Sequence, residues 1–270
     1  MECRLSNATV NYEVYGEGRP VLIIHGFSID HRAMVGCFEP VFENKPGYKR
    51  IYIDLPGMGK TKGEEWIQGT DDMLKVVLDF IDEVLPNQSF LLAGQSYGGY
   101  LARGIVAKRP EQVDGVALVV PMIIPDFDKR ELPQHQALVQ DADFLETLDP
   151  QLRDEFASLA VVQDHYNFDR TMQEIVPGSN IANQRFLVKI RNSYGFSFDP
   201  DALETPFAKP SLLITGRQDA TTGYADAFRI LHNYPRATYA TLDLAGHNLH
   251  IEQKTLFDAL VEEWLERVKR

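Results

Sequence analysis

The regular alternation of buried apolar runs with helical patterns restricts the fold of this chain more than any other feature. Six runs are continuous and mostly apolar: 20–26 (PVLIIHG), 50–57 (RIYIDLPG), 90–94 (FLLAG), 113–120 (VDGVALVV), 211–216 (SLLITG) and 237–244 (ATYATLDL). Such runs are typical of strands buried on both faces of a sheet. Two shorter strand signals precede them at 3–6 and 9–15, and helical patterns cover 71–84, 97–108, 221–232 and 253–268. The alternation predicts βαβ crossovers and therefore an α/β fold with a mostly parallel sheet.

The helical pattern at 71–84 has its apolar residues on one face, as expected for a helix that packs on a sheet. Asp71 and Asp72 fall in its first turn, where negative charge is favourable. Thr70 directly precedes the pattern and is expected to cap the helix with its hydroxyl group.

The interval 122–205 interrupts the alternation, because no strand signal falls within it. It is helix-rich, acidic and dotted with aromatic residues, and prolines stand near both of its ends. We expect an inserted helical cap over 122–205, within a core made of 1–121 and 206–270. A chain of 270 residues is long enough for one such elaborated domain with a well-buried core.

The charge balance indicates a class of partner. The formal net charge is −12, which argues against nucleic acid or an anionic membrane and favours a small-molecule substrate. The N-terminal sequence MECRLSNATV has no apolar stretch of signal-peptide length, and no apolar run could span a bilayer. Cys3 and Cys37 are the only cysteines and are read as ordinary reduced thiols. The expected location is cytoplasmic, and nothing in the sequence indicates an oligomeric state.

A serine stands between glycines in GQSYG, residues 94–98, directly after a strand signal and before a helical pattern. Glycines two residues on either side of a serine let strand and helix approach closely around a sharp turn, which holds the hydroxyl clear of the sheet. The alternative is a purely structural role, in which the turn is glycine-rich and the serine only caps the helix. The context favours Ser96 as a nucleophile.

A serine needs a base to accept its proton, and the base needs an acid to orient it. Asp219 and His247 each follow the end of a later strand, where open parallel sheets place their sites. Among the rival acids, Asp243 is expected to be structural and Asp126 to belong to the cap. His250 follows His247 at the spacing of a metal-binding pair, but no third ligand stands nearby, so no metal site is expected.

Acyl transfer also needs two backbone N–H groups that face the developing charge on the oxygen. One is expected from Tyr97, which follows the nucleophile. The other is expected from Phe27, in the loop HGFSID after the first long strand. Gly26 would let this loop turn, and His25 would brace it through hydrogen bonds.

These motifs together resemble the α/β-hydrolase superfamily, in the branch with a serine nucleophile and a helical cap. The resemblance rests on HGF (25–27), DLPGMGKT (54–61), GQSYGG (94–99), GRQD (216–219) and GHNLHIE (246–252). It implies an eight-stranded α/β-hydrolase sheet flanked by helices, whose first two strands form an antiparallel edge. The order serine, aspartate, histidine is that of the superfamily. GMGKT is not a phosphate-binding loop, because Asp54 occupies the place of its first glycine.

The resemblance implies acyl transfer with Ser96 as nucleophile, His247 as base and Asp219 as orienting acid. We expect a carboxylesterase-like hydrolase of a small ester, with no organic cofactor and no metal. A proline-iminopeptidase-like aminopeptidase is disfavoured, since that family has HGGPG where this chain has HGFSI, but the acidic cap keeps it open. Lactonase, thioesterase and carbon–carbon bond hydrolase also remain open. A small-molecule receptor on the same fold is the alternative from another class.

Overall fold

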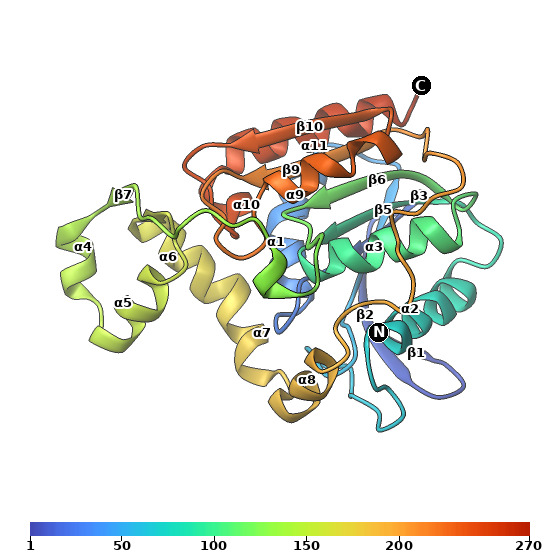
Figure 1. The fold of residues 1–270 in the computed structure, drawn as a ribbon, viewed down its shortest axis with the longest axis horizontal. Helices are drawn as coiled ribbons and strands as arrows, with labels where there is room; N and C mark the ends of the chain where they lie inside the picture. The colour runs from blue at the N-terminus through green and yellow to red at the C-terminus, as the bar shows by residue number, and fades with distance from the viewer.

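An eight-stranded sheet forms the centre of the molecule in a computed structural model, which describes residues 1–270 (Figure 1). Its strands are β1 (Glu2–Arg4), β2 (Thr9–Tyr15), β3 (Arg19–Ile24), β4 (Tyr48–Ile53), β5 (Phe90–Gln95), β6 (Val113–Val119), β9 (Ser211–Gly216) and β10 (Ala237–Leu242). They lie in the order β1-β2-β4-β3-β5-β6-β9-β10. The β1–β2 and β2–β4 pairs are antiparallel, and all other pairs are parallel. The expected α/β fold is confirmed, including its antiparallel edge.

Helices cover both faces of this sheet. The longer ones are α1 (His31–Phe42), α2 (Thr70–Val84), α3 (Tyr97–Lys108) and α11 (Lys254–Arg267), and two short ones, α9 (Ala225–Arg229) and α10 (Leu249–Glu252), follow β9 and β10. Helices α2 and α3 pack on one face, and α1 and α11 pack together on the other. No helix is both long and apolar enough to cross a membrane.

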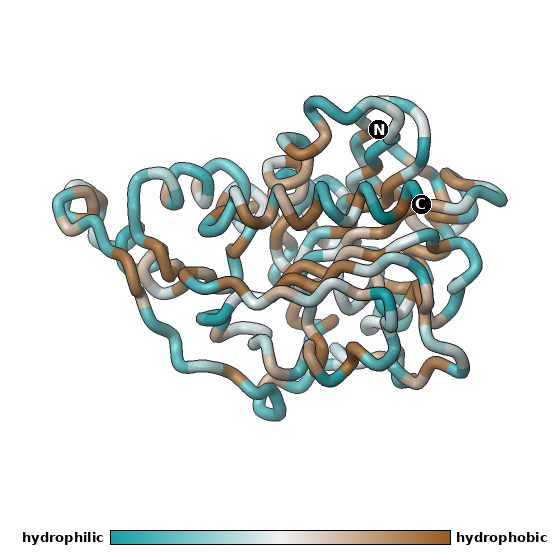
Figure 2. Tube along the Cα trace, turned by 90° about the horizontal axis from the view of Figure 1, so that it is seen from above, coloured by the Kyte–Doolittle hydropathy of each residue, from teal (hydrophilic) through white to brown (hydrophobic).

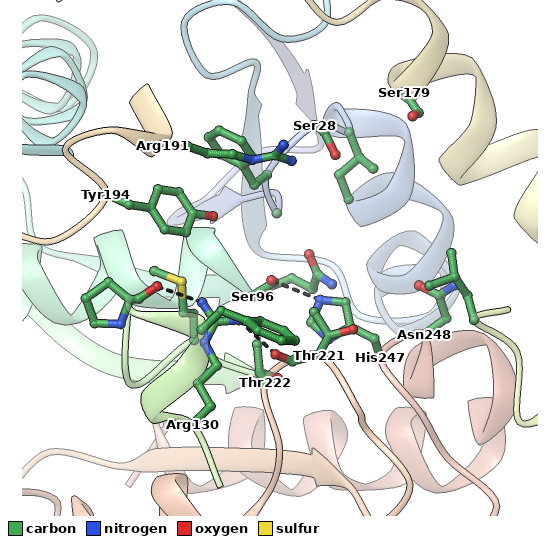
Figure 3. Close-up of a pocket in the computed structure, with 18 of the residues that line it drawn as sticks. Ser28, Ser96, Arg130, Ser179, Arg191, Tyr194, Thr221, Thr222, His247 and Asn248 are labelled. Atoms are coloured by element: carbon green, nitrogen blue, oxygen red, sulfur yellow. Dashed lines mark hydrogen bonds between the residues drawn. The ribbon is translucent and has the colours of Figure 1, made fainter. Parts of the chain in front are cut away.

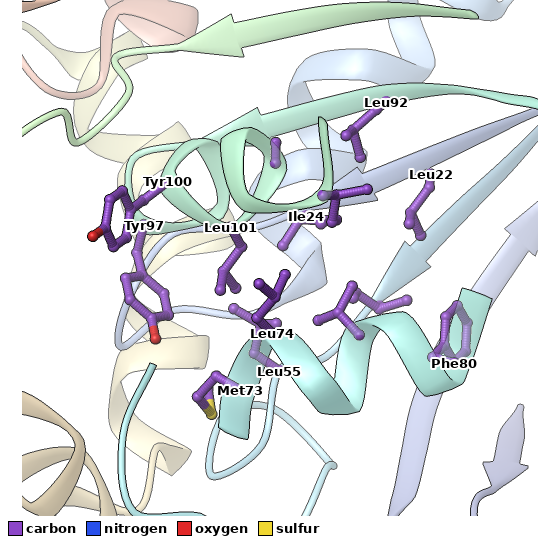
Figure 4. Packing of buried hydrophobic residues seen from close by; sticks show 14 of the residues in the cluster. Leu22, Ile24, Leu55, Met73, Leu74, Phe80, Leu92, Tyr97, Tyr100 and Leu101 are labelled. Carbon is purple, nitrogen blue, oxygen red and sulfur yellow. The ribbon is translucent and has the colours of Figure 1, made fainter. Parts of the chain in front are cut away.

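The apolar strands form a separate core on each face. On one face, Leu22 and Leu92 of the sheet belong to the same cluster as Leu74 of α2 and Leu101 of α3 (Figure 4). On the other face, strand residues cluster with the buried side chains of α1 and α11. Figure 2 shows the apolar segments concentrated along the strands in the middle of the molecule. Burial on both faces explains why the central strands β3, β5, β6 and β9 read as continuous apolar runs. For 237–244 the prediction of a strand buried on both faces is wrong, because β10 is an edge strand and is mostly half-buried.

The interval between β6 and β9 is mostly helical. It contains α4 (Ala142–Thr147), α5 (Pro150–Ala157), α6 (His165–Arg170), α7 (Val176–Ile181) and α8 (Gln184–Arg191), with a π-helical turn at Thr171–Ile175 between α6 and α7. Helices α4 and α5 project away from the sheet (Figure 1) and share a small apolar cluster around Leu145, Phe156 and Ala160. Two strands that the sequence does not predict, β7 (Val139–Gln140) and β8 (Val162–Gln163), pair within this interval. Each is only two residues long, which is too short to show the alternation of apolar and polar residues by which a strand is recognised in a sequence.

Two other local predictions are wrong. Thr70 does not cap α2, because the cap position is Gly69 and no side chain bonds there. The Thr70 hydroxyl instead contacts the Tyr97 hydroxyl at 2.9 Å and donates to the Tyr194 carbonyl oxygen at 2.8 Å. The helix expected over 221–232 is reduced to α9 and a 3-10 turn at Leu231–Asn233, because Gly223 has a left-handed φ of 70° that a helix cannot contain.

Candidate active site

Ser96 occupies a strained turn between β5 and α3. Its φ of 54° lies in the left-handed region, which a side chain other than glycine rarely adopts. A Cβ atom at Gly98 would overlap the carbonyl oxygens of Ile24 and His25, and one at Gly94 would overlap the Gly98 carbonyl group. The glycines therefore let the strand and the helix approach around the serine. The Ser96 side chain makes no capping hydrogen bond to α3, which contradicts the alternative of a simple helix cap.

Ser96, His247 and Asp219 are joined by two hydrogen bonds (Figure 3). His247 Nδ1 lies 2.9 Å from Asp219 Oδ2, and His247 Nε2 lies 2.9 Å from Ser96 Oγ. A carboxylate only accepts, so Nδ1 of the imidazole donates to Asp219, and Nε2 of the neutral ring is left to accept the serine proton. The structure thus brings together three residues that lie far apart in the chain and that the sequence predicts to act as nucleophile, base and acid.

Asp219 is fully buried and held as an anion. Burial alone raises the pKa of its carboxyl group. Attraction to the imidazolium form of His247 and hydrogen bonds from His247 and Thr222 outweigh this effect and set the pKa below its usual value. The Thr222 hydroxyl donates to Oδ2 at 2.7 Å, and the N–H groups of Thr221 and Thr222 donate to Oδ1 at 2.8 and 3.0 Å. Sequence reasoning missed Thr222, although it falls where an Asx-type turn after Asp219 would place a donor.

The rival residues lie outside this chain of hydrogen bonds. Asp243 is exposed and accepts a hydrogen bond from the Gln218 side chain. Asp126 begins the 3-10 turn at Phe127–Lys129 and pairs with Lys129 at 2.9 Å. His250 is fully buried, and neither of its ring nitrogens has a hydrogen-bond partner.

Asp30, His31 and Asp54 form the one cluster with the spacing of a metal site. Its members already have partners. Asp54 Oδ1 lies 2.7 Å from His31 Nδ1, Asp54 Oδ2 accepts the Lys60 N–H, and Asp30 pairs with Arg32. The hydrogen bonds to Asp54 hold together the loop after β4, so we read the cluster as structural.

The expected oxyanion loop follows β3. His25 braces it, with Nδ1 donating to the Gly26 carbonyl oxygen at 2.7 Å and Nε2 accepting the Leu55 N–H at 3.0 Å. The Phe27 N–H has no hydrogen-bond acceptor in the structure. The Tyr97 N–H opens α3, where first-turn N–H groups have no partner within their own helix. Both groups are therefore available to an incoming oxygen, and their role as an oxyanion hole stays a prediction.

A cavity of about 840 Å³ opens on Ser96 and His247 (Figure 3). Its size fits a small-molecule site. The core supplies Phe27, Ile29 and Gln95 to the wall. The segment 122–205 supplies Met122, Pro125, Asp126, Phe127, Arg130, Leu159, Ile175, Ser179, Arg191, Tyr194 and Gly195. Sequence reasoning singled out the aromatic residues of this segment as a group, but only Phe127 and Tyr194 line the cavity.

Comparison with known proteins identifies relatives over nearly the whole chain. Residues 19–254 match the model of a family described as alpha/beta hydrolase fold. A pimeloyl-(acyl-carrier protein) methyl ester esterase of Legionella pneumophila is 24% identical over 259 residues, which cover 95% of this chain and 99% of that protein. An (E)-2-((N-methylformamido)methylene)succinate hydrolase of Acinetobacter baylyi is 21% identical, covering 97% and 95%. The crystal structure of an alpha/beta superfamily hydrolase from Oenococcus oeni superposes with a TM-score of 0.90 at 27% identity, over 100% of both chains.

Proposed function

The chain belongs to the alpha/beta hydrolase fold family, and from that membership we propose that it is a serine hydrolase that cleaves a small carboxylic ester through an acyl-enzyme intermediate. The observation that carries the proposal is the pair of 2.9 Å hydrogen bonds that join His247 to Ser96 and to Asp219, where Ser96 and His247 line the cavity. The Legionella relative is named as a methyl ester esterase, which supports an ester as the bond that is cleaved.

The first half of the reaction acylates the serine. Ser96 Oγ attacks the carbonyl carbon of the ester while its proton passes to His247 Nε2. The N–H groups of Phe27 and Tyr97 stabilise the negative charge that develops on the carbonyl oxygen. The tetrahedral species then collapses, the alcohol leaves with the proton from Nε2, and the acyl group stays on Ser96.

The second half releases the acid. Water gives a proton to His247 Nε2 and attacks the acyl carbon, and the proton returns to Ser96 Oγ as the acid departs. Asp219 stabilises the imidazolium in both halves, because its carboxylate is buried against Nδ1 and its lowered pKa keeps it ionised. The side chains of this site, its backbone N–H groups and water supply every group that these steps use.

We also propose that residues 122–205 form a cap that selects the substrate. Both ends of this segment are tied to the core through the buried Arg103 of α3, which donates to the Met122 carbonyl oxygen at 2.9 Å and pairs with Asp201. Leu159 and Ile175 from the segment line the cavity, and they would limit the length of an acyl group. Short and medium acyl chains should therefore be preferred over long ones.

A substrate panel tests the proposal. p-Nitrophenyl esters of increasing acyl length should be hydrolysed over many turnovers, and Ser96→Ala should lower kcat by on the order of a millionfold without unfolding the protein. Amino-acid p-nitroanilides in the same panel test the aminopeptidase alternative. Unchanged hydrolysis by folded Ser96→Ala would remove the serine from the mechanism. Binding without repeated turnover would favour a receptor.

A further inference from the structure

Arg191 is an arginine of the cavity wall that has no partner. It is the last residue of α8, and its guanidinium lies over the Phe27 ring, with Cζ 5.1 Å from the ring centroid. It makes no ion pair and no hydrogen bond in the structure, although acidic residues outnumber basic ones by 39 to 27. Arg191 is exposed to solvent and unpaired where it lines the cavity, so its charge is available to a ligand.

The contact with Phe27 leaves the hydrogen-bonding edge of Arg191 free. A guanidinium is planar, so its face can rest on an aromatic ring while its N–H groups point outward in a fixed fork. That fork matches the two oxygens of a carboxylate. Phe27 in turn packs edge-on against Tyr97 and Tyr194, at 5.1 and 5.0 Å between ring centroids, so the platform under the guanidinium is itself supported.

Two serine hydroxyl groups with no hydrogen-bond partner also line the cavity. Figure 3 draws Ser28 and Ser179 on the side of the cavity where the Arg191 side chain lies. Both residues line the cavity, and neither hydroxyl makes a hydrogen bond in the structure. Ser28 also has a left-handed φ of 66°, a backbone strain that clusters at functional sites.

A second arginine lines the cavity. Arg130 lies on the opposite side from Arg191 (Figure 3) and donates to three carbonyl oxygens, which leaves two of its five N–H groups unused. Asp126 is the only acidic residue of the wall, and it is paired with Lys129. The wall therefore carries two guanidinium groups against one carboxylate that is already paired, a balance that favours an anionic ligand over a cationic one.

We propose that the substrate carries a carboxylate group that binds to Arg191 while its ester carbonyl group lies at Ser96. The proposal rests on the serine hydrolase function proposed above and adds the substrate class, half-esters of dicarboxylic acids or their close analogues. Ser28 would donate a further hydrogen bond to the carboxylate.

The test compares monomethyl esters of linear dicarboxylic acids, from succinate upward, with the corresponding dimethyl esters. The wild type should show the higher kcat/KM for the half-ester at the best chain length. Arg191→Gln should lower the ratio of the two kcat/KM values about tenfold, as expected for loss of a charged hydrogen bond. Arg191→Lys should keep part of the preference. Arg185→Gln is the matched control, because Arg185 is an exposed arginine of the same helix outside the cavity, and it should leave the ratio unchanged.

Preference for the diester at every chain length, or an unchanged ratio in Arg191→Gln, would overturn the proposal. A second readout does not depend on turnover. The free dicarboxylate should slow the labelling of Ser96 by a fluorophosphonate in the wild type and not in Arg191→Gln, and absence of protection contradicts the carboxylate site. If Ser96 neither labels nor turns over an ester, the hydrolase function fails, and calorimetric binding of the dicarboxylate still decides the Arg191 site.

Discussion

His250 should make this protein unstable in mild acid. The ring is fully buried on α10, edge-on to Phe257, and neither nitrogen has a hydrogen-bond partner. Burial, followed by the positive charges of Arg170 and His247, lowers the pKa of His250 from 6.5 to about 3. The folded state therefore keeps the ring neutral at a pH where the unfolded chain protonates it.

The sign and the size follow from proton linkage. A lowered pKa means that the contribution of His250 to stability is complete above about pH 6.5 and is lost as the pH falls towards 3. Each pH unit in this window removes about 1.4 kcal/mol. Between about pH 7 and about pH 5, the loss amounts to roughly 2 kcal/mol. The size of this loss does not depend on the exact pKa of His250 in the folded state, because both pH values lie well above 3.

The assay is denaturant unfolding of wild type and His250→Leu at these two pH values. Leucine is close in volume and needs no hydrogen bond, so the variant should be at least as stable as the wild type near pH 7. Its loss between the two pH values should be roughly 2 kcal/mol smaller than that of the wild type. His232→Leu, at an exposed histidine, is the control and should keep the wild-type dependence. An unchanged acid dependence in His250→Leu would mean that His250 is not the group whose protonation destabilises the folded state.

Three further changes test Asp219 as the orienting acid, the turn around Ser96 and residues 122–205 as a cap. Asp219→Asn should fold and lower kcat by roughly ten-thousandfold, whereas Asp243→Asn, at an exposed carboxylate, should leave kcat within about twofold in the same ester assay. Gly98→Ala should lower the unfolding free energy by at least about 2 kcal/mol in urea melts, because its methyl group would overlap two backbone carbonyl oxygens. Exchange of residues 122–205 for the corresponding segment of an esterase with a different acyl preference should transfer that preference. A preference that stays with the core would place the specificity in the strand-end loops.

The predictions from sequence succeeded where a short stretch determines its own environment. Strands β3, β5 and β9 are continuous apolar runs because both of their faces are buried, and this leaves a direct signal in the sequence. The turn at Ser96 is set by glycines whose missing side chains make room for the backbone, so it too can be read locally. Asp219 and His247 lie close to Ser96 because parallel strands bring their carboxyl ends to one edge of the sheet, and their catalytic roles stay a prediction.

The remaining features depend on segments that meet only in the folded chain. Arg103 looks like a solvated residue of α3, yet it is buried because Asp201, 98 positions away, pairs with it. The Thr70 hydroxyl bonds to Tyr97 and Tyr194 and does not cap its own helix, because these two distant residues meet it only in the folded chain. Arg191 lines the cavity because of the course that the backbone takes over residues 122–205. No periodic pattern of apolar residues within that segment predicts this course.

The most direct measurement of the central claim is intact-protein and peptide mass spectrometry after reaction with a fluorophosphonate. Because His247 Nε2 lies 2.9 Å from Ser96 Oγ and its ring is oriented by Asp219, this one hydroxyl should react far faster than any other in the chain. We expect a single adduct per chain, on the peptide that contains Ser96. The adduct should be absent from Ser96→Ala, and esterase turnover should be lost in proportion to labelling. An adduct at another residue, or full esterase activity in completely labelled protein, would contradict the central claim.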